Sequence, residues 1–92
     1  MDKHEVERRL EAAIERLASI EHERWAHWQR YLHSKGRQLA DGSIVIPPEL
    51  VAQWSRQMDT HYEDLPPEER ESDREQVRRY LPAVVAVVAQ SR

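Results

Sequence analysis

The stretch Ile20–Leu32, IEHERWAHWQRYL, holds two of the chain's three tryptophans, one of its three tyrosines and two of its five histidines. It contains no proline or glycine, and Trp25, Trp28 and Leu32 follow one another at intervals of three and four. That spacing places side chains on one face of an α-helix. We therefore predict that this stretch is the central helix of the fold and that its apolar face forms the main core.

The helical pattern continues toward the N-terminus through four further apolar residues: Val6, Leu10, Ile14 and Leu17. A single helix is therefore predicted from Asp2 to about His33, with Gly36 just beyond its end. At about 1.5 Å per residue it would be roughly 45 Å long, which is more than a domain of this size can cover. Residues 1–13 are expected to project as a helical extension, or to pack on another copy of the chain.

Two shorter helices are predicted in the second half of the chain. Pro47-Pro48 opens a short middle helix that ends near Asp59, since proline is tolerated in a first helical turn. Pro67 opens a C-terminal helix. Pro82 lies inside that helix and should kink or split it, because proline removes one backbone hydrogen bond.

The segment between the first two helices, residues 36–47, is predicted to be a loop. Asp41-Gly42 is a turn signal, and residues 43–46 could pair as a very short strand. The expected fold class is therefore all-α. One domain covers residues 1–92, with a long N-terminal helix, a short middle helix and a kinked C-terminal helix.

Composition limits the classes of function. The net charge of −3 argues against a general nucleic-acid binder, which usually carries a basic excess. No apolar run approaches the roughly 18 residues that a membrane span needs. The chain has no cysteine, which excludes disulfides and thiolate metal sites and fits a cytoplasmic location. Because so short a chain buries only about 60% of its unfolded surface, a homo-oligomer, dimeric or higher, is expected.

The charges are unevenly distributed. Residues 24–40 contain four basic residues and no acidic ones, whereas acids dominate residues 63–75. A local cationic segment on an acidic protein suits a small anionic ligand better than a DNA duplex. The alternative is a solvated helix face that pairs with the acidic segment.

Charged residues also interrupt the apolar face of the first helix. With Trp25 at 0° on a helical wheel, Glu21 falls at about −40°, within the apolar stripe. Arg24 lies at the edge of the stripe, and His22 flanks Trp25 on the other side. In one interpretation Glu21 and Arg24 form a buried ion pair, shared with Arg74, that fixes helix packing. In the other, the stripe opens into a pocket whose ligand contacts Glu21, His22, Arg24, and Trp25 or Trp28.

Catalytic and metal-binding motifs are not recognisable. His22 and His27 are five residues apart, whereas the zinc motif H-E-x-x-H needs a spacing of four to place both histidines on one helix face. No nucleophile motif or phosphate-binding loop is present. We therefore expect a protein that is not an enzyme and that holds no metal and no cofactor.

Three segments together resemble a known family. The segments Glu21-His22-x-x-Trp25, Tyr62-x-x-Leu65-Pro66 and Asp73-Arg74 resemble the RyR domain. This small helical module is repeated in ryanodine receptors and is also found in bacterial and phage proteins. The second and third segments lie in YEDLPPEERESDR, in which the spacing from the tyrosine to the Asp-Arg pair agrees with the family. The family's G-W-x-Y-G segment is missing, and the segment Pro48–Met58 looks like an insertion.

The resemblance implies ligand binding rather than catalysis. It implies a nucleotide or nucleotide-derived signalling molecule as ligand, sequestered by the protein in a phage-type member. Five residues carry over as candidate ligand contacts: His22, Trp25, Tyr62, Asp73 and Arg74. For Asp73 and Arg74 the alternative is structural, an acid at a helix N-terminus and an ion pair to Glu21.

A second class of function rests on the apolar run AVVAVVA, residues 83–89, and on the long first helix. A helix segment that is apolar all round is usually buried between helices or subunits. The alternative function is therefore a homo-oligomeric interaction or assembly module without a small-molecule ligand.

Overall fold

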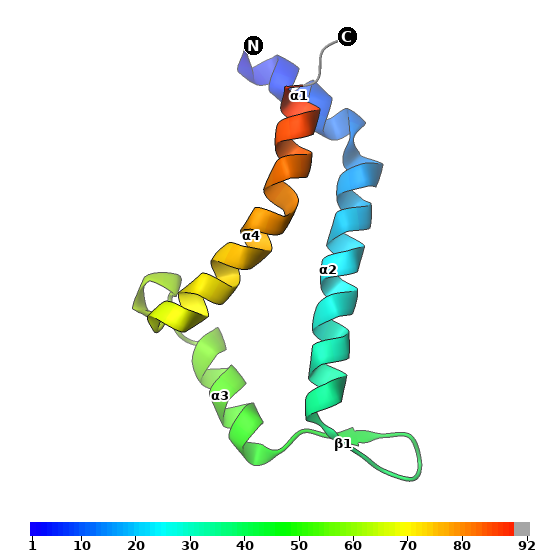
Figure 1. Ribbon diagram of the computed structural model, residues 1–92, viewed down its shortest axis with the longest axis vertical. Helices are drawn as coiled ribbons and strands as arrows, with labels where there is room; N and C mark the ends of the chain where they lie inside the picture. Colours follow the sequence, from blue (N-terminus) through cyan, green and yellow to red (C-terminus); the bar gives the residue numbers. More distant parts are fainter. Residues whose placement is uncertain (90–92) are drawn as a thin grey trace.

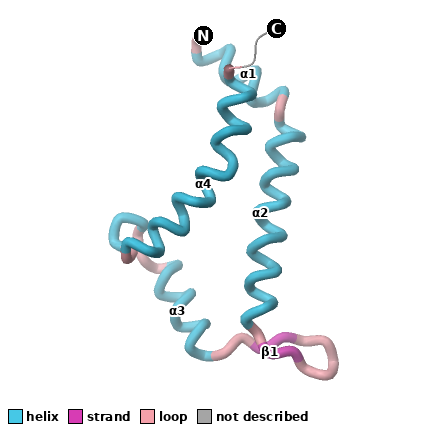
Figure 2. Tube along the Cα trace, viewed as in Figure 1, coloured by secondary structure: helices cyan, strands magenta, loops and turns pink. Residues whose placement is uncertain are grey.

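A computed structural model describes residues 1–89 and shows an all-α chain, which confirms the predicted fold class. In chain order its elements are α1 (Lys3–Ala12), α2 (Ile14–Lys35), β1 (Arg37–Gln38), β2 (Ile44–Val45), α3 (Pro48–Met58), the 3-10 turn η1 (Tyr62–Asp64) and α4 (Pro67–Val88). Figure 2 shows that strand is confined to one small hairpin in this part of the chain. None of the helices within residues 1–89 is both long and apolar enough to cross a membrane.

The prediction of one continuous N-terminal helix was wrong at Ala13. This residue leaves the helical conformation, with φ −99° and ψ 15°, and separates α1 from α2. The cause is a tertiary contact, because the turn carries α1 across the end of α4 (Figure 1). There Arg9 donates a hydrogen bond to the carbonyl oxygen of Val88. Residues 1–13 therefore pack on α4 of their own chain.

The hairpin after α2 has the turn and the short strand predicted from the sequence. β1 and β2 pair antiparallel, and Gly42 occupies the turn with φ 90°, a conformation that favours glycine. Gly36 lies just past the end of α2, as predicted, but its backbone conformation is one that any residue can adopt. Its φ of −91° is ordinary, but a Cβ there would lie 2.1 Å from Ile44 Cγ2. The absence of a side chain lets the second strand approach the helix end.

The helices α3 and α4 both begin at prolines, as predicted. An ion pair of 3.2 Å between Arg56 and Glu69 connects the two helices. Helix α4 continues through Pro82 without a break, and Figure 1 shows it changing direction in its C-terminal half. Pro82 therefore bends α4 and does not split it.

The helices of the described chain lie mostly side by side in one layer (Figure 1). The principal-axis extents of the chain are 54 × 35 × 17 Å, so it is thin along one axis. Figure 1, viewed along that axis, shows α2 and α4 side by side near α1 and far apart at the hairpin end. The radius of gyration is 18.0 Å, whereas a compact chain of this length has about 12 Å.

The predicted core on the first helix is not buried, which is a correction to the sequence-based expectation. Among residues 1–89 only Val87 is buried, with 3% of its surface exposed. Ile14 and Trp25, from the predicted stripe, are 51% and 56% exposed. Helix α2 instead turns another face toward α4, and that face carries Ile20 and His27.

Candidate functional site

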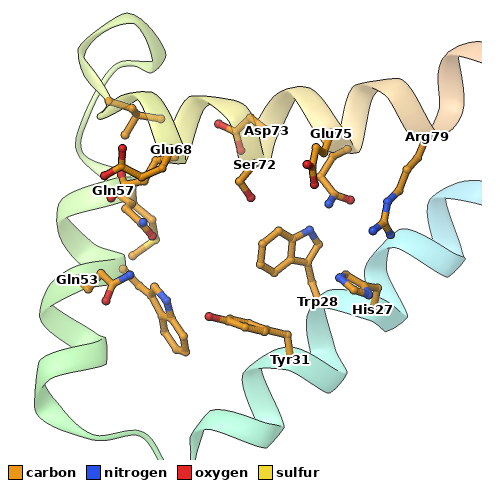
Figure 3. A pocket seen from close by; sticks show the side chains of 15 residues that line it. His27, Trp28, Tyr31, Gln53, Gln57, Glu68, Ser72, Asp73, Glu75 and Arg79 are labelled. Atoms are coloured by element: carbon orange, nitrogen blue, oxygen red, sulfur yellow. The ribbon is translucent and has the colours of Figure 1, made fainter.

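A cleft of about 570 Å³ lies between α2, α3 and α4. Figure 3 shows side chains from all three helices converging on it. The lining residues are His27, Trp28 and Tyr31 of α2, Gln53, Trp54, Gln57 and Met58 of α3, Leu65, and Glu68, Glu69, Ser72, Asp73, Glu75, Gln76 and Arg79 of α4.

Three aromatic rings, together with Met58 and Leu65, form the apolar part of the cleft. Trp28 and Tyr31 extend from neighbouring turns of α2 into the space between the helices (Figure 3). Their rings pack edge to face, with centroids 5.6 Å apart and an interplanar angle of 86°. The ammonium group of Lys35 lies 5.3 Å from the centre of the Tyr31 ring. Trp54 closes the cleft from α3. Rings held in this way can stack on a planar ligand.

The polar part of the cleft is acidic. Helix α4 contributes four carboxylates against one arginine, Arg79, while α3 adds two glutamines. Glu69 is paired with Arg56, but Glu68, Asp73 and Glu75 have no ion-pair partner within residues 1–89. Such a lining repels phosphate groups, whereas its carboxylates and amides can accept from, and donate to, the edge of a nucleobase.

The structure places two of the eight predicted site residues, Trp28 and Asp73, in this cleft. Glu21 and Arg24 do pair, in a bidentate contact between neighbouring turns of α2, with one N–H···O distance of 2.8 Å. Their side chains are 56% and 44% exposed, so the predicted buried ion pair is wrong. The hydrogen bond from Arg24 lowers the pKa of the Glu21 carboxyl and raises that of the guanidinium.

His22 and Trp25 lie on a face of α2 outside the cleft. Their rings stack at 5.8 Å with an interplanar angle of 25°, and both side chains are exposed. Arg24 turns toward α4 and lines a second hollow of about 100 Å³ together with Tyr80. The charged residues and Trp25 therefore do not form one wall of one pocket.

Tyr62 and Arg74 come close to each other but stay outside the cleft. Arg74 pairs with Glu71 at 3.1 Å, and Glu71 also accepts from Arg78 at 2.6 Å. Glu71 and the nearby Tyr62 raise the pKa of Arg74, while the two arginines, Arg78 first, lower that of Glu71. Arg74 thus takes its partner from its own helix, and the predicted ion pair with Glu21 does not form.

Several cleft residues were not among the sequence-based candidates. Tyr31 follows His27 and Trp28 at helical spacing, so the sequence did hold a signal for an aromatic face on α2. Trp54 follows Leu50 and precedes Met58 at intervals of four, a spacing typical of the packing face of a helix, which gave no reason to expect it beside a hollow. The two glutamines of α3 carry no sequence signal.

Metal binding and family membership find no support. No group of three or more histidine, aspartate and glutamate side chains within residues 1–89 is placed to hold a metal ion. Comparisons with protein-family models, curated proteins and solved structures find no match to this chain.

Proposed function

We propose that this protein is a homo-oligomeric interaction module, dimeric or higher, whose missing second layer is another copy of the chain. The observation that carries the proposal is burial. Only Val87 is buried among residues 1–89, whereas fourteen large hydrophobic residues are exposed. Domains are stable when two layers of secondary structure bury a core between them, and one layer offers no such core.

The accessible area supports an interface of substantial size. The chain exposes 7516 Å², whereas a compact monomer of 10.9 kDa exposes about 5600 Å². The excess is about 1900 Å² per chain, and obligate homodimers bury about 2000–5000 Å² in total. If two copies bury this excess area against each other, the total buried area of the dimer falls within that range. A cytoplasmic location fits the lack of cysteine.

Sedimentation equilibrium and small-angle X-ray scattering of the full chain test this proposal. At about 100 µM we expect at least twice the monomer mass. We also expect a radius of gyration close to the roughly 16 Å of a compact two-chain particle. A helical monomer of 10.9 kDa with a radius of gyration near 18.0 Å would contradict the proposal.

The second candidate is binding of a nucleotide-derived molecule in the cleft between α2, α3 and α4, without catalysis. The specific observation in its favour is the combination of three aromatic rings with amides and carboxylates around about 570 Å³. The resemblance to RyR domains supports the same ligand class. The acidic lining favours the base and ribose as the recognised parts, with any phosphate directed out of the cleft.

Calorimetry against nucleosides, mono-, di- and cyclic nucleotides and ADP-ribose derivatives tests the second candidate. Since stacking on an aromatic ring contributes about 1–3 kcal/mol per base, Trp54→Leu should weaken binding by about 5- to 150-fold. Tyr62→Leu is the control, because Tyr62 lies outside the cleft. A panel without binding tighter than about 1 mM (about −4 kcal/mol) rejects this function. Binding that depends on Tyr62 and not on Trp54 rejects the cleft as its site.

A further inference from the structure

Helix α2 carries an apolar seam with the spacing of a coiled coil. Successive intervals of four, three, four, three and four residues connect Ile14, Ala18, Glu21, Trp25, Trp28 and Leu32. These are the a and d positions of a heptad repeat, with Ala18, Trp25 and Leu32 at a. Such a seam packs against another helix.

Most of this seam is uncovered within residues 1–89; of its members only Trp28, at the edge of the seam, also lines the cleft between α2, α3 and α4. The residues of α2 that line the two hollows facing α4 centre on Ile20, Arg24 and His27. At about 100° per residue the seam lies roughly 110° around the helix from that face. Five of its six members are exposed, among them Ile14 at 51%, Trp25 at 56% and Trp28 at 38%, and Leu32 is half-buried.

The charge of α2 changes sign along its length. Residues 14–23 contain three glutamates and one arginine, whereas residues 24–35 contain two arginines, one lysine and no acid. Of these three basic residues only Arg24 has an ion-pair partner within residues 1–89, namely Glu21. Two such helices side by side repel one another when parallel. When antiparallel, they place the acidic half of each beside the basic half of the other.

We propose that α2 packs antiparallel along the seam of α2 from a second copy of this chain. The two-fold axis passes between the levels of Glu21 and Trp25, so that a positions face d positions. Ile14 then faces the partner's Leu32, Ala18 faces the partner's Trp28, and Glu21 faces the partner's Trp25. This arrangement rests on the proposed homo-oligomer and specifies its interface.

Three further features fit this register. The smallest seam residue, Ala18, lies opposite the large Trp28, so volumes are complementary. Glu21 enters the seam already paired with Arg24, and a single polar group at a seam position can fix register and orientation. Helix α4 runs beside α2 and exposes Val77, Leu81 and Val85 at intervals of four. Two α2–α4 pairs can therefore close into a four-helix bundle.

Distances between spin labels test the orientation directly, because the chain has no native cysteine. Glu15→Cys and His22→Cys place nitroxide labels one heptad apart on the same flank of the seam. In the antiparallel register the two labels at position 22 are offset by about 3 Å along the axis and those at position 15 by about 24 Å. A parallel pair gives equal, short distances at both positions, and an interface elsewhere gives long distances at both. Either outcome overturns the inference.

A pair of charge-introducing substitutions separates this inference from the proposed function. Trp25→Glu should weaken self-association by about 30-fold or more, as expected for an aromatic residue at the centre of an interface. Val51→Glu is the matched control, since Val51 is 48% exposed on α3, away from the seam, and should leave association unchanged. A wild-type monomer rejects the proposed function itself. An oligomer that Trp25→Glu does not weaken rejects only the α2 seam.

Discussion

Diluting the full chain a hundredfold is expected to lower its midpoint temperature of unfolding by about 5–10 °C. One buried side chain among residues 1–89 cannot offset the conformational entropy of ordering the chain. In the proposed homo-oligomer the interface supplies the stability, so unfolding is coupled to dissociation. A hundredfold change in concentration then changes the free energy of unfolding by about 2.7 kcal/mol per dimer. Each kcal/mol shifts the midpoint of a unit of about 180 residues by about 2–4 °C.

Circular dichroism melts at several concentrations between about 1 and 100 µM (a hundredfold range) measure this shift. A tandem chain, with two copies joined by a flexible Gly/Ser linker, is the control. Its two halves remain at high effective concentration, so its midpoint should not change on dilution. A wild-type midpoint that is equally independent of concentration would show that the single chain is stable alone, and would contradict the proposed function.

Local signals in the sequence predicted the elements well, because each of those signals acts over a few residues. Pro48 and Pro67 start helices by their own backbone geometry, and Asp41-Gly42 forms its turn without help from the rest of the chain. The break at Ala13 has no such signal. It follows from the contact between α1 and α4, which are far apart in the sequence, so no local pattern could indicate it.

The candidate site was less predictable for a related reason. Helical periodicity shows which residues share a face, and it correctly grouped Ile14, Trp25 and Leu32. It does not show what covers that face, so a seam left open in the single chain was interpreted as a core. Glu21 was correctly recognised as an interruption of the stripe, but its partner Arg24 lies on the same helix and both are exposed. The cleft, by contrast, depends on how α3 is placed against α2, which no spacing within one helix determines.

The substitution Val87→Asp is expected to destabilise the folded chain by about 2.5–6 kcal/mol. Val87 is 3% exposed in the last turns of α4, where α1 crosses that helix. Losing a buried valine side chain costs about 1.5–3 kcal/mol, and leaving a polar group there without a partner costs about 1–3 kcal/mol more. The total is a large share of the 5–15 kcal/mol typical of a folded protein.

Urea denaturation at one fixed chain concentration measures this loss. Ala86→Asp is the matched control, because Ala86 is exposed in the same turn of α4. An acid near a helix C-terminus is unfavourable in both variants by about 0.3–1 kcal/mol, so that effect cancels between them. The difference between the two variants should then be about 2.5 kcal/mol or more, with Val87→Asp the less stable. Equal denaturation midpoints would mean that α1 does not pack on α4 in solution, and the contact that breaks the N-terminal helix at Ala13 would be lost with it.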